Sequence, residues 1–579
     1  MQAEKTTRRN KRSQIAACGI CCLTFFSNAV VLAQAPTNVE RDTAEQRRAQ
    51  ERETQLREQQ PQAPDVRLSS QSPLAQQRFP ESETPCFAIQ ALELQGDAGG
   101  HFTWLLDSLA GPQGNDAPLH KCLGAKGISL VLQRAQEALV AKGYVTSRVL
   151  AQPQDLSSGK LILTVLPGRI RAIRFAEPVD PRATAWNAVP AKPGDFLNLR
   201  DIEQALENFK RVPTAEADIQ ITPGEQPGES DLLVVYQQRF PLRVSLSADD
   251  SGTKATGKYQ GSATLSVDNF LGFNDLLYLT FNHDLGGGST GPRGTQGSST
   301  HYSLPYGYWM LGTTFGESRY YQTVAGNSQN YVYSGTSGFA EIKLARLVYR
   351  DAKRKTTTSL KAFERHSNNF IDDTEIQVQR RVVGGWEFGV NHKEFLGVAT
   401  LEVNLAYKRG TGAFGSIPAP EDASGEGTSH LALLATDGSL NWPFKVARQP
   451  LRYLATWRVQ NHHTALTPQD RFAIGGRYTV RGFDGESSLS AESGWLLRNE
   501  LGATLGESGQ ELYVGLDHGE VSGPSSDLLV GKWLTGVVMG MRGSIKKLQY
   551  DFFVGRPINK PADFKTADFT AGMSLSLSL

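Results

Sequence analysis

The sequence has almost no net charge and, beyond its first residues, no long apolar run. Its 60 lysines and arginines stand against 59 aspartates and glutamates, which gives +1 over 579 residues. A balanced chain gives no electrostatic basis for a nucleic acid as the main partner. The mean hydropathy of −0.35 is too low for a bundle of membrane helices. It is compatible with a membrane β-barrel, whose strands alternate apolar and polar residues.

The one long apolar stretch lies at the start. Residues 1–35 are predicted to be a secretory signal peptide: a basic segment precedes the apolar stretch Ile15–Leu32, and Ala33-Gln34-Ala35 is a small-x-small cleavage site. An uncleaved anchor helix is the alternative, because the stretch nearly reaches spanning length. Glycine and polar residues within the stretch weaken that alternative.

Cysteine is scarce as well. Three of the five cysteines lie within residues 1–35, so the exported chain would keep Cys86 and Cys122. Two cysteines in an exported chain predict one disulfide, and closing this loop would stabilise the fold by roughly 4 kcal/mol. Two buried free thiols are the alternative. A zinc site would need more ligands, and the sequence indicates no metal and no cofactor.

Residues 36–60 lack glycine and, from 38 on, proline, and they are predicted to form a helix. Acidic and basic side chains stand three or four residues apart, as in Glu45/Arg48 and Glu53/Arg57, which favours a helix. Because the helix has almost no apolar face, it is either a solvated tail or a helix inside a water-filled polar cavity. Residues 61–84, rich in Pro, Gln and Ser, are predicted to be a mobile linker.

Two small α+β modules are predicted next, each in β-α-α-β-β order. In residues 85–167, strands are expected near Phe87–Leu94, Val145–Ala151 and Lys160–Val165, with helices near Phe102–Leu109 and Ile128–Lys142. In residues 168–238, strands are expected at Ile170–Phe175, Asp218–Ile221 and Asp231–Tyr236, with an amphipathic helix at Leu199–Lys210. A three-stranded sheet with an open edge could bind an extended peptide as an added strand, although a single mixed domain is the alternative.

Residues 239–579 change character and are predicted to form a transmembrane antiparallel β-barrel. Short segments alternate with period two, as where Leu401, Val403 and Leu405 alternate with Glu402 and Asn404. At about 20 residues per strand and connection, this region would hold roughly 16 strands, an allowed even number. A soluble sandwich or propeller is the alternative.

One loop of this region contains a large cation among glycines. In Val480-Arg481-Gly482-Phe483, the glycine permits a tight backbone tip, and a planar guanidinium suits a bidentate contact with a carboxylate. A solvated surface loop is the other interpretation. No H-E-x-x-H motif indicates an enzyme, and alternation along a strand separates the adjacent His462 and His463.

Short motifs in this order resemble the TpsB transporters of two-partner secretion, the haemolysin secretion and activation proteins of the ShlB/FhaC/HecB type, with a CdiB-type member as one possibility. The modules resemble POTRA domains. The similar stretches are Gly143-Tyr144-Val145-Thr146-Ser147-Arg148, Gln154-Asp155-Leu156, Leu197–Leu206, Val480-Arg481-Gly482-Phe483 and Leu516-Asp517. Two departures are Phe483, where many members have Tyr, and Leu579, where an aromatic residue often ends the chain.

The resemblance implies a fold-back loop and a plug. The loop at about 464–493, before the twelfth strand, would enter the pore, where Arg481 pairs with Asp517 on the wall and Phe483 packs beside it. The helix at 36–60 would plug the resting pore, and both modules would lie in the periplasm.

The resemblance also implies the function: an outer-membrane pore that passes one large unfolded exoprotein, an adhesin, haemolysin or contact-dependent toxin, to the cell surface without ATP. Its expected partners are that exoprotein, bound by the modules, the outer-membrane lipid, and the periplasmic chaperones and barrel assembly machinery. The chain is assumed to be a monomer. A Bam-type assembly factor and a passive porin are the alternatives.

Overall fold

The computed structural model describes residues 38–61, 63–68, 77–96 and 100–579. The predicted signal peptide and part of the predicted linker therefore lie outside the described residues. Within those ranges, no helix combines the length and apolar character needed to cross a membrane.

The first described element is the helix α1 (Asn38–Glu58), in the region where the polar segment predicts a helix. It is followed by a small domain built on a three-stranded sheet in the order β2-β5-β4. The elements of this first module are β1 (Phe87–Ala88), β2 (Ala91–Gln95), α2 (Leu105–Ser108), β3 (Cys122–Leu123), α3 (Ala125–Ala141), β4 (Arg148–Leu150) and β5 (Lys160–Leu166). Its core packs the apolar face of α3 on the sheet, with Val131, Leu139 and Leu163 fully buried.

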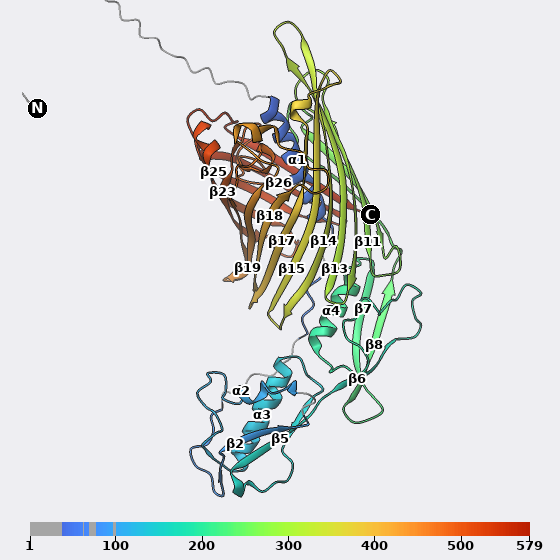
Figure 1. Ribbon diagram of the computed structural model, residues 1–579, viewed down its shortest axis with the longest axis vertical. Coiled ribbons are helices and arrows are strands. Elements are labelled where there is room, and N and C mark those ends of the chain that lie inside the picture. Colours follow the sequence, from blue (N-terminus) through green and yellow to red (C-terminus); the bar gives the residue numbers. More distant parts are fainter. Residues whose placement is uncertain (1–37, 62, 69–76, 97–99) are drawn as a thin grey trace, which may run out of the picture. The chain divides into compact units, whose positions relative to one another are not determined.

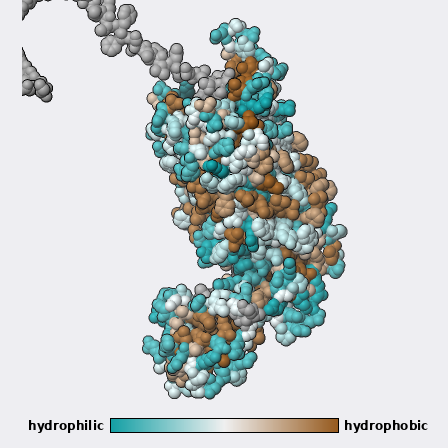
Figure 2. Space-filling model, in the orientation of Figure 1, coloured by the Kyte–Doolittle hydropathy of each residue, from teal (hydrophilic) through white to brown (hydrophobic). Residues whose placement is uncertain are grey.

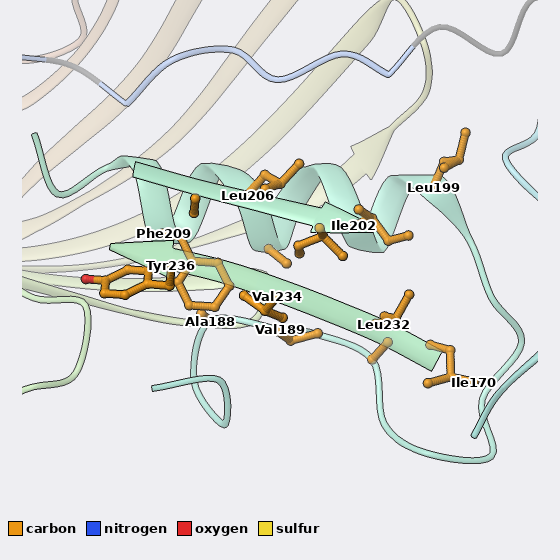
Figure 3. Close-up of a cluster of buried hydrophobic side chains, with 14 of the residues drawn as sticks. Ile170, Ala188, Val189, Leu199, Ile202, Leu206, Phe209, Leu232, Val234 and Tyr236 are labelled. Carbon is orange, nitrogen blue, oxygen red and sulfur yellow. The ribbon is translucent and has the colours of Figure 1, made fainter. Parts of the chain in front are cut away.

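The second module repeats the sheet but not the first helix. It has β6 (Arg169–Phe175), α4 (Leu199–Lys210), β7 (Ala215–Pro223) and β8 (Glu229–Gln238), with strand order β6-β8-β7. The β-α-α-β-β prediction is therefore wrong for residues 168–238, where turns occupy 177–187 in place of a helix. Figure 3 shows why α4 is well defined: Ile202, Leu206 and Phe209 line one face of the helix and pack on Val234 and Tyr236 of the sheet.

The remainder of the chain closes into an antiparallel barrel, as predicted. The strands are β9 (Leu242–Asp249), β10 (Tyr259–Asp268), β11 (Leu276–Gly286), β12 (Gly294–Tyr306), β13 (Trp309–Ala325), β14 (Asn330–Arg350), β15 (Arg354–Ile371), β16 (Thr374–Glu375), β17 (Arg381–Leu396), β18 (Ala399–Thr411), β19 (Ala432–Val446), β20 (Gln449–His462), β23 (Ser493–Thr504), β24 (Glu511–Ser522), β25 (Trp533–Ile545), β26 (Leu548–Asn559) and β27 (Thr570–Ser578). Because β15 pairs directly with β17, the short β16 is not a wall strand, and the expected 16 strands are confirmed. The barrel closes where β27 pairs with β9.

Alternation along the strands sorts side chains to two faces. On β18, Leu405 is 43% exposed on the outer face, whereas Asn404 donates a hydrogen bond to Asp437 of the next strand, 2.9 Å away, on the inner face. Figure 2 shows apolar residues gathered in a band across the visible face of the barrel. Large exposed apolar residues on the outer face of several strands include Leu246, Phe281, Phe315, Leu360 and Phe388. An apolar outer face with a polar interior is the pattern of a barrel in lipid.

Candidate functional site: the loop and helix inside the barrel

The connection between β20 and β23 folds into a small unit of its own. It holds a two-stranded hairpin, β21 (Phe472–Ile474) with β22 (Leu489–Ala491), and the tip residues lie between these strands. Val480 and Phe483 are buried in a cluster with wall residues such as Leu496 and Leu534, and the ring of Phe483 meets that of Phe564 edge-on at 5.7 Å. The apolar tip residues thus dock the loop on the inner wall.

Arg481 is the polar centre of this contact. Its Nε donates to Asp517 Oδ2 at 2.6 Å and its Nη2 to Asp517 Oδ1 at 2.8 Å, so the pairing is bidentate. The backbone N–H of Arg481 also donates to Asp517 Oδ2, at 3.1 Å. Arg481 is 4% exposed and Asp517 is fully buried. The structure therefore brings together the two residues that the sequence motifs paired.

A second carboxylate, which sequence reasoning missed, also accepts a hydrogen bond from Arg481. Nη1 of Arg481 donates to Glu500 on β23, and Arg542 Nη2 donates to the other Glu500 oxygen at 2.8 Å. Arg498 Nε lies 3.8 Å from Asp517 Oδ2. The pairing of β23 with β24 explains why Glu500 faces inward. Arg498 lies opposite Asp517, which faces inward, and Glu500 is two residues further along the same strand, so it points to the same side.

Glycines on the wall make room for the tip. A Cβ at Gly536 would stand 1.9 Å from the Arg481 carbonyl oxygen, and one at Gly515 would stand 2.9 Å from Arg481 Nη2. On the loop side, Gly482 has φ of 93°, and a Cβ there would stand 2.6 Å from the Arg556 carbonyl oxygen. Backbone lies against backbone here, which only glycine permits.

The helix α1 lies inside the barrel and bonds to wall strands (Figure 1). Tyr320 on β13 donates to Asp42 at 2.8 Å, and Ser299 on β12 donates to Glu53 at 2.7 Å. Arg57 pairs with Glu341 on β14 at 3.0 Å. Of the two interpretations left open by the sequence, the structure has the helix in a polar cavity.

The helix also touches the loop directly. Arg47 Nη1 donates to Ser490 Oγ at 2.9 Å, and Arg48 Nη2 donates to the Gly485 carbonyl oxygen at 2.8 Å. Gly485 lies shortly after the tip residues, and Ser490 lies on β22. The two elements inside the barrel therefore share contacts, and a displacement of one changes the surroundings of the other.

The remaining predicted residues lie in the first module and on the strand ends. Cys86 and Cys122 form a disulfide with a Cα–Cα distance of 5.3 Å, beside the pairing of β1 with β3. His462 contacts Ser493, whereas His463 lies near the ring of Tyr407. Within the described ranges, no three His, Cys, Asp or Glu side chains are grouped in a way that could hold a metal ion.

A closed barrel with an apolar outer band, a helix and a folded loop in its interior and two small domains before it has the architecture of an outer-membrane transporter. Comparison with known protein families agrees with this class. The model described as haemolysin secretion/activation protein ShlB/FhaC/HecB matches residues 228–543. Two POTRA models match residues 87–168, where the match is of the ShlB type, and residues 169–223.

Individual relatives and solved structures match over nearly the whole chain. The outer membrane transporter CdiB-2 of Burkholderia pseudomallei (strain 1026b) is 36% identical, with 94% of each chain covered. The haemolysin transporter protein ShlB of Serratia marcescens is 25% identical, with 69% of this chain and 71% of that protein covered. The structure of CdiB from Acinetobacter baumannii has a TM-score of 0.81 at 30% identity, covering 94% of this chain and all of that one.

The chain belongs to the ShlB/FhaC/HecB family of haemolysin secretion/activation proteins. It is an outer-membrane transporter of two-partner secretion, and its POTRA domains lie in the periplasm. The family consists of transporters rather than enzymes, and a Bam-type assembly role is the weaker alternative.

Proposed function

We propose that α1 is the plug of the resting pore and that Arg481 anchors the loop beside it, so that export of an exoprotein requires α1 to leave. In this proposal the chain is divided as the sequence predicts: plug 36–60, linker 61–84, modules 85–167 and 168–238, and barrel 239–579. The cargo is a large unfolded exoprotein, of the adhesin, haemolysin or contact-dependent toxin class. Periplasmic chaperones and the barrel assembly machinery would act earlier, when the barrel is inserted.

The burial of a polar helix carries this proposal. Asp42, Glu45 and Arg52 are each at least 93% buried, although α1 has almost no apolar residues. A helix of this kind gains little from apolar packing, so its place depends on its polar partners on the wall and on the loop. Such contacts can be exchanged for water, which suits an element that must leave.

The modules offer a place for the incoming chain. Each has a three-stranded sheet with two edges, β2 and β4 in the first module and β6 and β7 in the second. An extended segment can pair with such an edge through its backbone, with little dependence on its sequence. Transport needs no ATP in this scheme, because folding of the cargo outside the cell makes passage irreversible.

Single-channel conductance tests the plug. The chain lacking 38–58 should open more often and for longer in planar bilayers than the full chain, because the interior loses the helix and its wall contacts. In the full chain, Asp42→Ala should increase the frequency and duration of openings, but by less than the deletion does, since it removes the partner of Tyr320. Gln50→Ala, at an exposed position of the same helix, is the matched control and should not change the openings. Equal openings with and without α1 would contradict the plug.

A further inference from the structure

The segment that follows α1 is bound where the second module meets the barrel. Val66 N–H donates to Glu207 Oε1 at 2.8 Å and Leu68 N–H donates to Glu203 Oε1 at 2.7 Å, and both carboxylates lie on α4. The side chains of Val66 and Leu68 pack against the apolar core of that module. Residues 65–68, called the strap here, therefore lie along α4 with backbone and side chains both engaged.

The barrel holds the same segment from the other side. Lys355 Nζ donates to Asp65 Oδ1 at 2.7 Å, and Lys393 Nζ lies 2.8 Å from Asp65 Oδ2. The guanidinium of Arg67 lies over the ring of Phe395, 4.1 Å from its centre. These three barrel residues lie at the ends of β15 and β17, which are neighbours in the wall. The strap therefore contacts the ends of two adjacent strands.

Arg350, at the end of β14, joins the three parts in one network. Its guanidinium makes five hydrogen bonds, which equals the number of its N–H donors. The acceptors are Glu203 Oε2 at 3.0 Å, Gln204 Oε1 at 3.2 Å, Glu207 Oε2 and Oε1 at 3.0 Å each, and the Val66 carbonyl oxygen at 2.6 Å. The Arg350 side chain is 3% exposed and that of Glu203 is fully buried.

We propose that Arg350 is a positioning residue for gating: it locks the strap between α4 and the barrel and so keeps α1 at the pore. The proposal rests on the proposed role of α1 as the plug. A displacement of α4 relative to β14, such as binding of the exoprotein to the second module could produce, would remove acceptors from Arg350 and the strap together. The strap would then be freed, and the cargo's arrival would be coupled to release of the plug.

The length of the connection gives the size of the effect. Asp65 in the strap lies seven residues after Glu58, the end of α1. With the strap released, the next described residue held by the first module is Gln77, 19 residues after Glu58, whose carbonyl oxygen accepts from Arg134 Nη2 at 2.7 Å. Across a flexible connection, local concentration falls as about the −3/2 power of length. A connection about 2.7 times longer (19 residues against 7) should return α1 to the pore roughly four to five times more slowly.

The test measures open dwell times of the full chain in planar bilayers. Arg350→Ala should lengthen them about fourfold or more, since the strap loses its lock and the plug returns more slowly. Arg354→Ala is the matched control: Arg354 lies at the start of the next strand and pairs with Asp351 at 2.7 Å, with no contact to the strap or α4. It should leave the dwell times unchanged. Arg350→Lys should fall between, because an ammonium group has three N–H donors where the guanidinium has five.

The same substitution in the chain lacking 38–58 separates gating from damage to the barrel. Without α1, Arg350→Ala should have no effect. A full-chain variant with unchanged dwell times would overturn the proposal, as would an equal lengthening in the chain without α1. If Arg350→Ala does not insert, Glu207→Gln supplies the same comparison. If deletion of α1 itself changes nothing, the plug proposal and this one both fall, whereas failure of Arg350→Ala alone leaves the plug intact.

Discussion

Gly536→Ala should undock the loop tip while leaving the barrel intact. The added Cβ would stand 1.9 Å from the Arg481 carbonyl oxygen, well inside van der Waals contact. That oxygen belongs to the backbone, so no side-chain rotation relieves the clash. The docked tip is therefore strained, and the alternative, a lifted tip, separates Arg481 from Asp517 and Glu500.

The magnitude follows from what the tip loses. Overpacking at a well-packed site typically costs about 1–3 kcal/mol, and separating a buried ion pair about 3–5 kcal/mol. The strained docked tip costs less than a lifted tip with a separated ion pair. We therefore expect a loss of docking free energy of about 2–3 kcal/mol. At about 1.4 kcal/mol per factor of ten, the undocked population should rise roughly 30- to 150-fold.

Hydrogen exchange at the Arg481 amide reports this change directly, because that N–H donates to Asp517. Its protection should fall by the same factor in Gly536→Ala. Gly515→Ala should have a smaller effect, since its Cβ would meet the movable end of the Arg481 side chain. Gly412→Ala is the control, because a Cβ there meets nothing within 4 Å. Equal protection in all three variants would refute the view that wall glycines admit the tip.

Three further predictions concern charged groups. Arg481→Ala should leave the barrel inserted but sharply reduce export, with Asp517→Lys behaving similarly, and normal export with normal insertion would contradict the anchoring role. Glu500→Gln should weaken docking by only about 1–2 kcal/mol, because the amide oxygen still accepts from Arg481, and exchange at the tip can measure it. In the first module, burial acts to raise the pKa of Asp116, but bonds from Lys121, Arg134 and the Phe79 N–H hold it at about 2. Because this pKa is lowered on folding, the stabilisation is present above about pH 4 and is lost as the pH falls toward 2. Hydrogen exchange in residues 87–166, corrected for the intrinsic exchange rate at each pH, should therefore lose protection across that range, and Asp116→Asn should reduce that loss.

Local pattern predicted well those elements whose partners are near in the sequence. The amphipathic stretch Leu199–Lys210 has the bounds of α4, and the side chain of Asn198 caps it by accepting from the Arg200 N–H at 2.8 Å. The pattern failed for the first helix of the second module, because similarity between the two modules was extended to residues 177–187, where no apolar periodicity supports it.

Apart from the Cys86–Cys122 disulfide, which the cysteine count predicts, contacts between distant segments were predicted only where a family motif joined them. Arg481 and Asp517 came from such motifs, whereas Glu500 and Arg350 did not. Arg350 meets Glu203 across 147 residues of sequence, and nothing in its own strand distinguishes it from other charged strand ends. Register and docking decide such contacts, and neither is visible in one sequence.

The polar character of α1 connects these observations. Had the helix carried an apolar face, leaving the pore would expose that face at about 25 cal/mol per Å². With polar contacts to charged groups, each bond to the wall contributes about 1.5–3 kcal/mol net, because water replaces it when the helix leaves. A plug held this way is weakly bound at every contact, so its retention depends on how closely its stem is tethered. That dependence makes the strap and Arg350, rather than any single contact within the barrel, the effective place for control of the pore.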